Sequence, residues 1–70
     1  MQQALFISRT SAHLALIKVC RELGMDDETI AKHGRAVPVY KRGNIEGYAA
    51  FYPTHPSYPE GKRPVMEEQL

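Results

Sequence analysis

Apolar residues in the first half of the chain recur with the period of a helix. Between residues 12 and 23, apolar side chains follow one another at intervals of three and four: Leu16, Ile17, Cys20 and Leu23. This spacing places them on one face of an α-helix. Gly24 can close such a helix in a left-handed conformation. We therefore expect a helix over residues 11–23 with this face buried.

A second, shorter helix is predicted immediately afterwards. Asp26 can accept hydrogen bonds from backbone N–H groups at the start of a helix, and the acidic residues that follow it favour the positive end of the helix dipole. Met25 and Ile30 have the spacing of a hydrophobic staple across that start. Because Gly34 arrives early, we expect the helix over residues 26–33.

The hydrophobic period changes from about 3.6 to about 2 at Ala36. Residues 37–41 and 47–52 are therefore predicted to be two antiparallel strands. The residues between them include two glycines and Asn44, which favour turns. Pro38 has no N–H to donate to a strand ladder, so we expect the first strand at an edge of its sheet.

The two ends of the chain have less regular patterns. After Tyr52, three prolines follow at every third residue, which favours polyproline II: Pro53, Pro56 and Pro59. Residues 66–70 can form one helical turn. The apolar run Ala4–Ile7 fits a strand or an arm packed across a helix. We expect a small single α+β domain, winged-helix-like, over residues 1–52 and a Pro-rich extended tail over residues 53–70.

Two helices joined at a glycine and followed by a two-stranded wing form a winged helix-turn-helix. The segment Arg21–Ile30 resembles the helix-turn-helix of the MerR-like group, which includes bacteriophage excisionases and Cox-type regulators. Gly34 followed by Val37–Tyr40 is similar to the turn into the wing of these proteins, and Gly47–Tyr52 looks like the returning wing strand. The resemblance covers about residues 12–52.

The resemblance implies a small non-enzymatic DNA-binding protein of the excisionase or phage-regulator type, acting architecturally and as a multimer on double-stranded DNA. The second helix would enter the major groove while the wing contacts the backbone or the minor groove. Carried over by position, the nucleic-acid-binding residues are Thr29, Lys32, His33 and Arg35, with Lys41, Arg42 and Asn44 on the wing.

Charge supports a different alternative. The net charge of the 70 residues is +1, which gives no overall field that steers the protein toward DNA. Residues 32–42 contain basic side chains and no acid, but residues 26–28 are all acidic and would repel phosphates at the second helix. The alternative function is a small protein-binding inhibitor or adaptor, of the kind that phages encode, docking on a host protein.

The remaining residues predict neither catalysis nor a bound metal or cofactor. Cys20 is the single cysteine, which excludes an intrachain disulfide and suits a reducing cytoplasm. Three histidines lie far apart, without the paired spacing of a zinc site, and no nucleophile stands beside a base. No apolar run reaches the roughly 20 residues of a membrane span, and the start lacks a secretory leader.

Two features point to a protein partner. A core of this size contributes little net stability, so self-association or docking is expected to supplement it. The segment Gln2–Phe6 matches the pattern Gln-x-x-Leu-Phe and resembles the short peptides that dock on bacterial sliding clamps. Leu5 and Phe6 would serve equally well as core residues.

Overall fold

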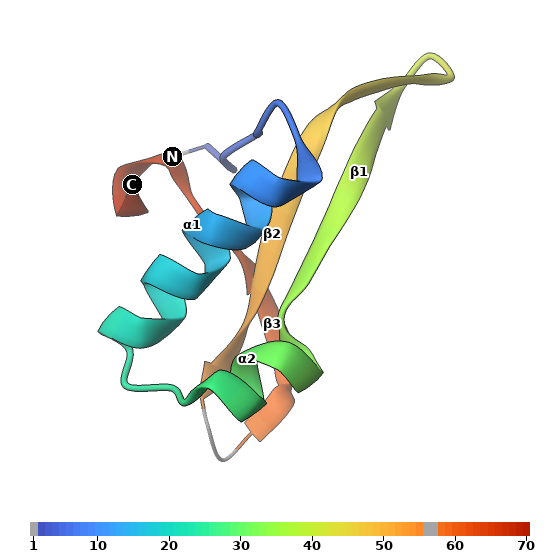
Figure 1. The fold of residues 1–70 in the computed structure, drawn as a ribbon. Coiled ribbons are helices and arrows are strands. Elements are labelled where there is room, and N and C mark those ends of the chain that lie inside the picture. The colour runs from blue at the N-terminus through green and yellow to red at the C-terminus, as the bar shows by residue number, and fades with distance from the viewer. Residues whose placement is uncertain (1, 56–57) are drawn as a thin grey trace.

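The computed structural model describes residues 2–55 and 58–70. Two helices precede a three-stranded antiparallel sheet of order β1-β2-β3 (Figure 1), which confirms the expected α+β class. The elements are α1 (Arg9–Glu22), α2 (Asp27–His33), β1 (Arg35–Lys41), β2 (Asn44–His55), β3 (Tyr58–Pro64) and a short 3-10 helix, η1 (Glu67–Gln69). Among the described residues, no helix has the length and apolar character that a membrane crossing requires.

Local capping defines the helices much as predicted. The Ser8 side chain caps α1 by accepting a hydrogen bond from the Ser11 backbone N–H at 3.1 Å. Asp26 caps α2 in the same way, accepting from the backbone N–H of Thr29 at 2.8 Å. Gly24 adopts a left-handed φ of 79° directly after α1. These bonds satisfy N–H groups that a helix start leaves without a partner.

The core lies between α1 and the sheet. α1 buries four side chains against it: Ala12, Leu16, Val19 and Cys20. The expected burial of Leu16 and Cys20 is confirmed, whereas Ile17 is only partly buried. Beyond this face, Ile30 is buried and Val39 is partly buried. The expected burial of Leu23 is wrong, since its side chain is 50% exposed. α1 ends at Glu22, so Leu23 leaves the inward face, and Met25 fills the core instead.

β1 and β2 form a hairpin with a tighter turn than the sequence suggested. Lys41 pairs with Asn44, which leaves a two-residue turn at Arg42 and Gly43. Both turn residues have positive φ, 53° and 81°, as in the type I′ turn that matches the twist of paired strands. β1 is an edge strand, as Pro38 predicted.

Residues 53–70 do not form the separate extended tail that was expected. β2 continues through Pro53, whose side chain is fully buried, and Pro53 pairs with Lys62 of β3. Val65 then enters the core. The two strands that were expected to form a wing are thus part of a three-stranded sheet, and the expected boundary after Tyr52 is wrong. Polyproline II and β conformations have similar backbone angles, so the proline spacing did not reveal the pairing. Pro56 lies outside the described residues.

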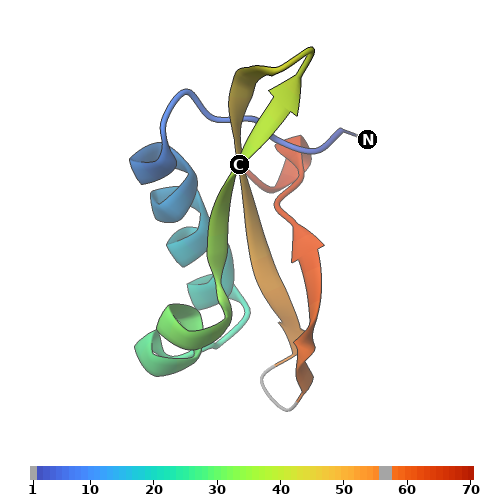
Figure 2. The same cartoon turned by 90° about the vertical axis from the view of Figure 1, so that its right-hand side faces the viewer.

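The N-terminal residues form an arm along the sheet. Phe6 and Tyr48 exchange two backbone hydrogen bonds, of 2.8 and 2.9 Å, and the Ala4 N–H donates to the Val65 carbonyl at 2.9 Å. The arm therefore occupies the edge of β2 beyond the end of β3. Figure 2 shows it crossing from the start of α1 to the opposite side of the sheet. Ala4 is buried and Leu5 is exposed.

Candidate functional site

The residues predicted to bind nucleic acid fall into two groups at opposite ends of β1. Four lie on α2 or at the start of β1: Thr29, Lys32, His33 and Arg35. Three lie at the hairpin: Lys41, Arg42 and Asn44. A strand rises about 3.3 Å per residue, so the ends of β1 are about 20 Å apart. Figure 1 shows α2 and the hairpin turn at opposite ends of that strand.

In the group near α2, Lys32 is paired with an acidic neighbour. Lys32 Nζ lies 2.9 Å from Glu28 Oε1. Hydrogen bonds from Thr29, by its side chain and then by its backbone N–H, lower the pKa of the Asp26 carboxyl below its ordinary value. Asp26 is therefore ionised at neutral pH beside the start of α2. This helix carries more negative than positive charge on its exposed surface.

The group at the hairpin differs from it. Lys41, Arg42 and Asn44 are exposed, and no ion pair involves them within residues 2–55 and 58–70. Tyr40 and Ile45 pair across the strands beside them and are 62% and 51% exposed. The hairpin projects past the start of α1 (Figure 1). It therefore presents two positive charges, two apolar side chains and the carboxylate of Glu46 directly to solvent.

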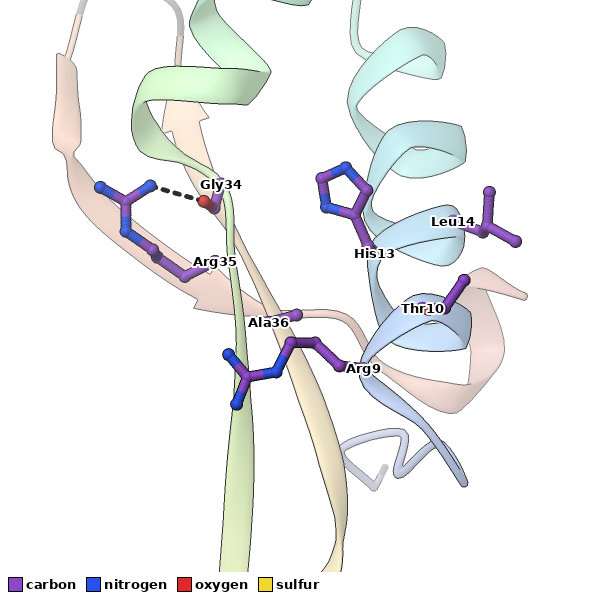
Figure 3. Close-up of a pocket in the computed structure, with 7 residues that line it drawn as sticks. All are labelled: Arg9, Thr10, His13, Leu14, Gly34, Arg35 and Ala36. Carbon is purple, nitrogen blue, oxygen red and sulfur yellow. Dashed lines mark hydrogen bonds between the residues drawn. The ribbon is translucent and has the colours of Figure 1, made fainter.

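A groove lies between α1 and the start of β1, with a volume of about 470 Å³. Its lining residues are Arg9, Thr10, His13, Leu14, Gly34, Arg35 and Ala36. Figure 3 shows Arg9 reaching from the first turn of α1 toward β1, and His13 pointing into the space between the two elements. The Arg9 guanidinium lies over the Tyr48 ring, 5.7 Å from its centroid, within the range of a cation–π contact.

Arg35 lies on the β1 wall of this groove. One of its guanidinium N–H groups donates to the Gly34 carbonyl at 2.7 Å. In the described part of the chain, neither Arg9 nor Arg35 forms an ion pair, and no acidic residue lines the groove. The groove is therefore cationic. Of its basic residues the sequence predicted only Arg35, because Arg9 and His13 reach β1 through the tertiary packing of α1.

A second cavity of about 310 Å³ lies between α1 and α2 and shares His13 with the first. It is lined by His13, Ile17, Arg21, Asp27, Ile30 and Ala31. Arg21 and Asp27 form an exposed ion pair there, with 3.4 Å between nitrogen and oxygen. A sequence signal for this surface exists, since Arg9, His13, Ile17 and Arg21 recur at every fourth residue of α1.

Cys20 and the histidines form no reactive centre in the described chain. Burial raises the pKa of the Cys20 thiol above its ordinary value of 9.0, so the thiol is protonated at neutral pH. A nucleophilic cysteine needs the opposite shift. Nowhere in residues 2–55 and 58–70 do three His, Cys, Asp or Glu side chains gather as metal ligands.

No family model, no curated protein and no solved structure matches this chain.

Proposed function

We propose that the protein binds double-stranded DNA through the β1–β2 hairpin, as a small architectural protein that acts in several copies. The observation that carries the proposal is the exposed pair of cations at the projecting turn, Lys41 and Arg42. A cation that neutralises a phosphate releases a condensed counterion, which drives binding. The hairpin carries one exposed acid, Glu46, but among the described residues neither cation of the turn is paired with it, whereas Lys32 of α2 is paired with Glu28.

The backbone of Arg42 supports the same interpretation. Its φ of 53° is left-handed, a conformation that costs most residues about 1–2 kcal/mol. Type I′ turns prefer Asn, Asp or Gly there. The Arg42 side chain is exposed, so it makes no buried contact that would offset this cost. An unfavourable residue at a projecting turn is a reason to infer a role in binding.

The outer edge of β1 favours a phosphate backbone over another strand. Edge strands avoid pairing with other chains by carrying proline and lysine, and β1 has Pro38 at its centre and Lys41 at its end. An added antiparallel copy of β1 would place Arg35 of one strand near Lys41 of the other, and these charges repel. A polyanion such as DNA does not need to pair with the strand, so Pro38 does not hinder it, and it is attracted by the positive charges that repel a second copy of β1.

The experiment titrates a labelled duplex with the parent and three variants at two salt concentrations. Lys41→Gln and Arg42→Asn each remove one positive charge from the hairpin, and Lys32→Gln is the matched control on α2. If Lys41 and Arg42 contact phosphates, the log–log salt slope is about −1.8, and each hairpin variant flattens it by about 0.9. Lys32→Gln leaves it unchanged.

Two results would count against this proposal. A larger loss for Lys32→Gln than for the hairpin variants would move the contact to α2, as the helix-turn-helix resemblance implies. The absence of measurable binding to any duplex, including the DNA upstream of the protein's own gene, would exclude DNA as the partner.

A second candidate function is a protein-binding inhibitor or adaptor, and the exposed apolar residues favour it. Ile7 is 95% exposed at the end of the arm, and Leu5, Tyr40 and Ile45 are also exposed. Of these, Tyr40 and Ile45 are neighbours across the hairpin, and exposed apolar side chains that lie together are typical of contacts with other proteins. A pull-down from lysate with and without nuclease separates the two functions. A partner that survives nuclease treatment and is lost in Ile7→Ser supports the adaptor.

A further inference from the structure

We propose that the two grooves along α1 form one docking site for an extended acidic peptide segment of a partner protein, with aliphatic side chains beside its acidic end. This site goes beyond DNA binding by the hairpin, and DNA is not needed to test it. The two grooves share His13, so they adjoin along α1 and one extended ligand can contact both.

The length of the site suits a short extended chain. The α1 residues that line it run from Arg9 to Arg21, which is about 18 Å along a helix axis. An extended peptide covers that length with five or six residues. The opposite wall comes from two nearby stretches of sequence, because residues 30–31 line one groove and residues 34–36 line the other.

The charge of the site selects an acidic ligand at one end. Arg9 and Arg35 line the groove at the start of α1, with the Thr10 side chain beside them. No acidic side chain among the described residues pairs with either arginine. Guanidinium groups bind carboxylates with two parallel hydrogen bonds where geometry allows. At the other end of the site, Arg21 is already paired with Asp27. The acidic residues of a ligand are therefore directed to the end that contains Arg9.

The middle of the site selects aliphatic side chains. Ile17 is partly buried, Ile30 is buried, and Ala31 leaves space beside them. Single-stranded nucleic acid fits this region less well, because its bases stack best on large aromatic side chains and no Phe, Tyr or Trp lines either groove. Asp27 at the far end would also repel a phosphate chain. A peptide with acidic residues followed by aliphatic ones satisfies both halves.

The test uses a fluorescein-labelled peptide, Asp-Glu-Asp-Leu-Val-Leu-Gly-Ser, titrated with the full chain and followed by anisotropy. The control peptide carries lysine at the three acidic positions. We expect saturable binding of the acidic peptide only. Backbone amide shifts should change at Thr10, His13, Ile17 and Ala31 and remain unchanged at the hairpin.

Variants separate the groove from general charge attraction. Arg9→Gln and Arg35→Gln should each weaken peptide binding about fivefold, as expected for one partly exposed ion pair. Lys41→Gln removes the same charge at the other end of β1 and should change the affinity less than about twofold. Ala31→Glu should abolish binding by filling the apolar part with a charged side chain. All four positions are exposed, and a melting curve for each variant checks that it folds.

Several outcomes would overturn the proposal. These are no saturable binding, equal binding of the lysine peptide, an equal loss in Lys41→Gln, or amide shifts that lie outside the grooves. Tighter binding of a single-stranded oligonucleotide at the same residues would assign the site to nucleic acid instead. Loss of duplex binding in Lys41→Gln bears only on the hairpin, so the two proposals fail independently.

Discussion

The two ends of β1 have opposite surroundings. Beside α2, Gly34 is so closely packed that an added Cβ would lie 2.7 Å from Leu16 Cδ2 and 2.8 Å from the Ile30 carbonyl oxygen. At the hairpin, a Cβ added to Gly43 would meet nothing within 4 Å, and the residues around it are exposed. The end of β1 beside α2 is packed against the core, whereas the hairpin end is exposed to solvent.

This difference also explains why similar basic residues differ in their capacity to attract a phosphate. Lys32 stands on a helix with three acidic residues at its start and is paired with Glu28. Lys41 and Arg42 stand where the chain turns back, away from the helices. The position of a cation in the fold, rather than the count of cations, decides whether it can attract a phosphate.

The largest expected effect is at the packed end. Leu16→Ala should reduce the free energy of unfolding by about 2–5 kcal/mol, because the Leu16 side chain is fully buried. The net free energy of unfolding of a domain of this size is of the same order. The variant should therefore be mostly unfolded at room temperature, as measured by circular dichroism. Leu14→Ala, at a 62% exposed position of the same helix, is the control and should shift stability by less than about 0.5 kcal/mol.

A smaller loss is expected for Gly34→Ala. The added methyl group must displace Leu16 or strain the backbone at Ile30, which should cost about 1–3 kcal/mol. Urea denaturation measures it. Arg35→Ala, at the next residue, alters an exposed side chain and should cost less than about 0.5 kcal/mol. Equal midpoints for the two variants would contradict the close packing at this end.

Acid should weaken the packed end through Asp26. The pKa of its carboxyl is lowered in the folded protein by the hydrogen bonds from Thr29, below an ordinary value of 3.8. Such a group stabilises the fold above the pKa of the unfolded chain, and this stabilisation disappears as the pH falls through the lower folded pKa. Asp26→Asn still caps α2, so its melting temperature should fall less below about pH 4. If the melting temperatures of parent and variant fall equally with pH, Asp26 does not stabilise the fold in this way.

The smallest effect should have the opposite sign. Arg42→Asn keeps the turn and relieves the left-handed arginine, so it should raise stability by about 0.5–1 kcal/mol. The same variant should weaken duplex binding. A thermal melt measures the first change and the duplex titration measures the second. A loss of stability would show that the Arg42 side chain supports the fold.

Much of the candidate site was visible in the sequence, and part of it was not. Lys41, Arg42 and Asn44 were predicted on the wing, and they lie exposed at the β1–β2 hairpin. The groove residues Arg9 and His13 were missed, because α1 is brought against β1 by packing that no local pattern encodes. Their four-residue spacing marks a helix face without saying what faces it.

Local interactions determined the helices and the edge strand. Asp26 and Thr29 are three residues apart, Gly24 adopts its left-handed φ within one turn, and Pro38 lacks a donor in any context. Such effects act between neighbours, so a pattern in the sequence is sufficient to predict them. They established two helices followed by antiparallel strands.

Only the tertiary structure decided how the two ends of the chain are used. Pro53 pairs with Lys62, the Ala4 N–H donates to the Val65 carbonyl, and Leu23 lies outside the core. Each outcome depends on which distant backbone groups and apolar surfaces remain unpaired after the rest has packed. Buried backbone groups must find partners, and here the partners come from opposite ends of the sequence, where periodicity carries no information.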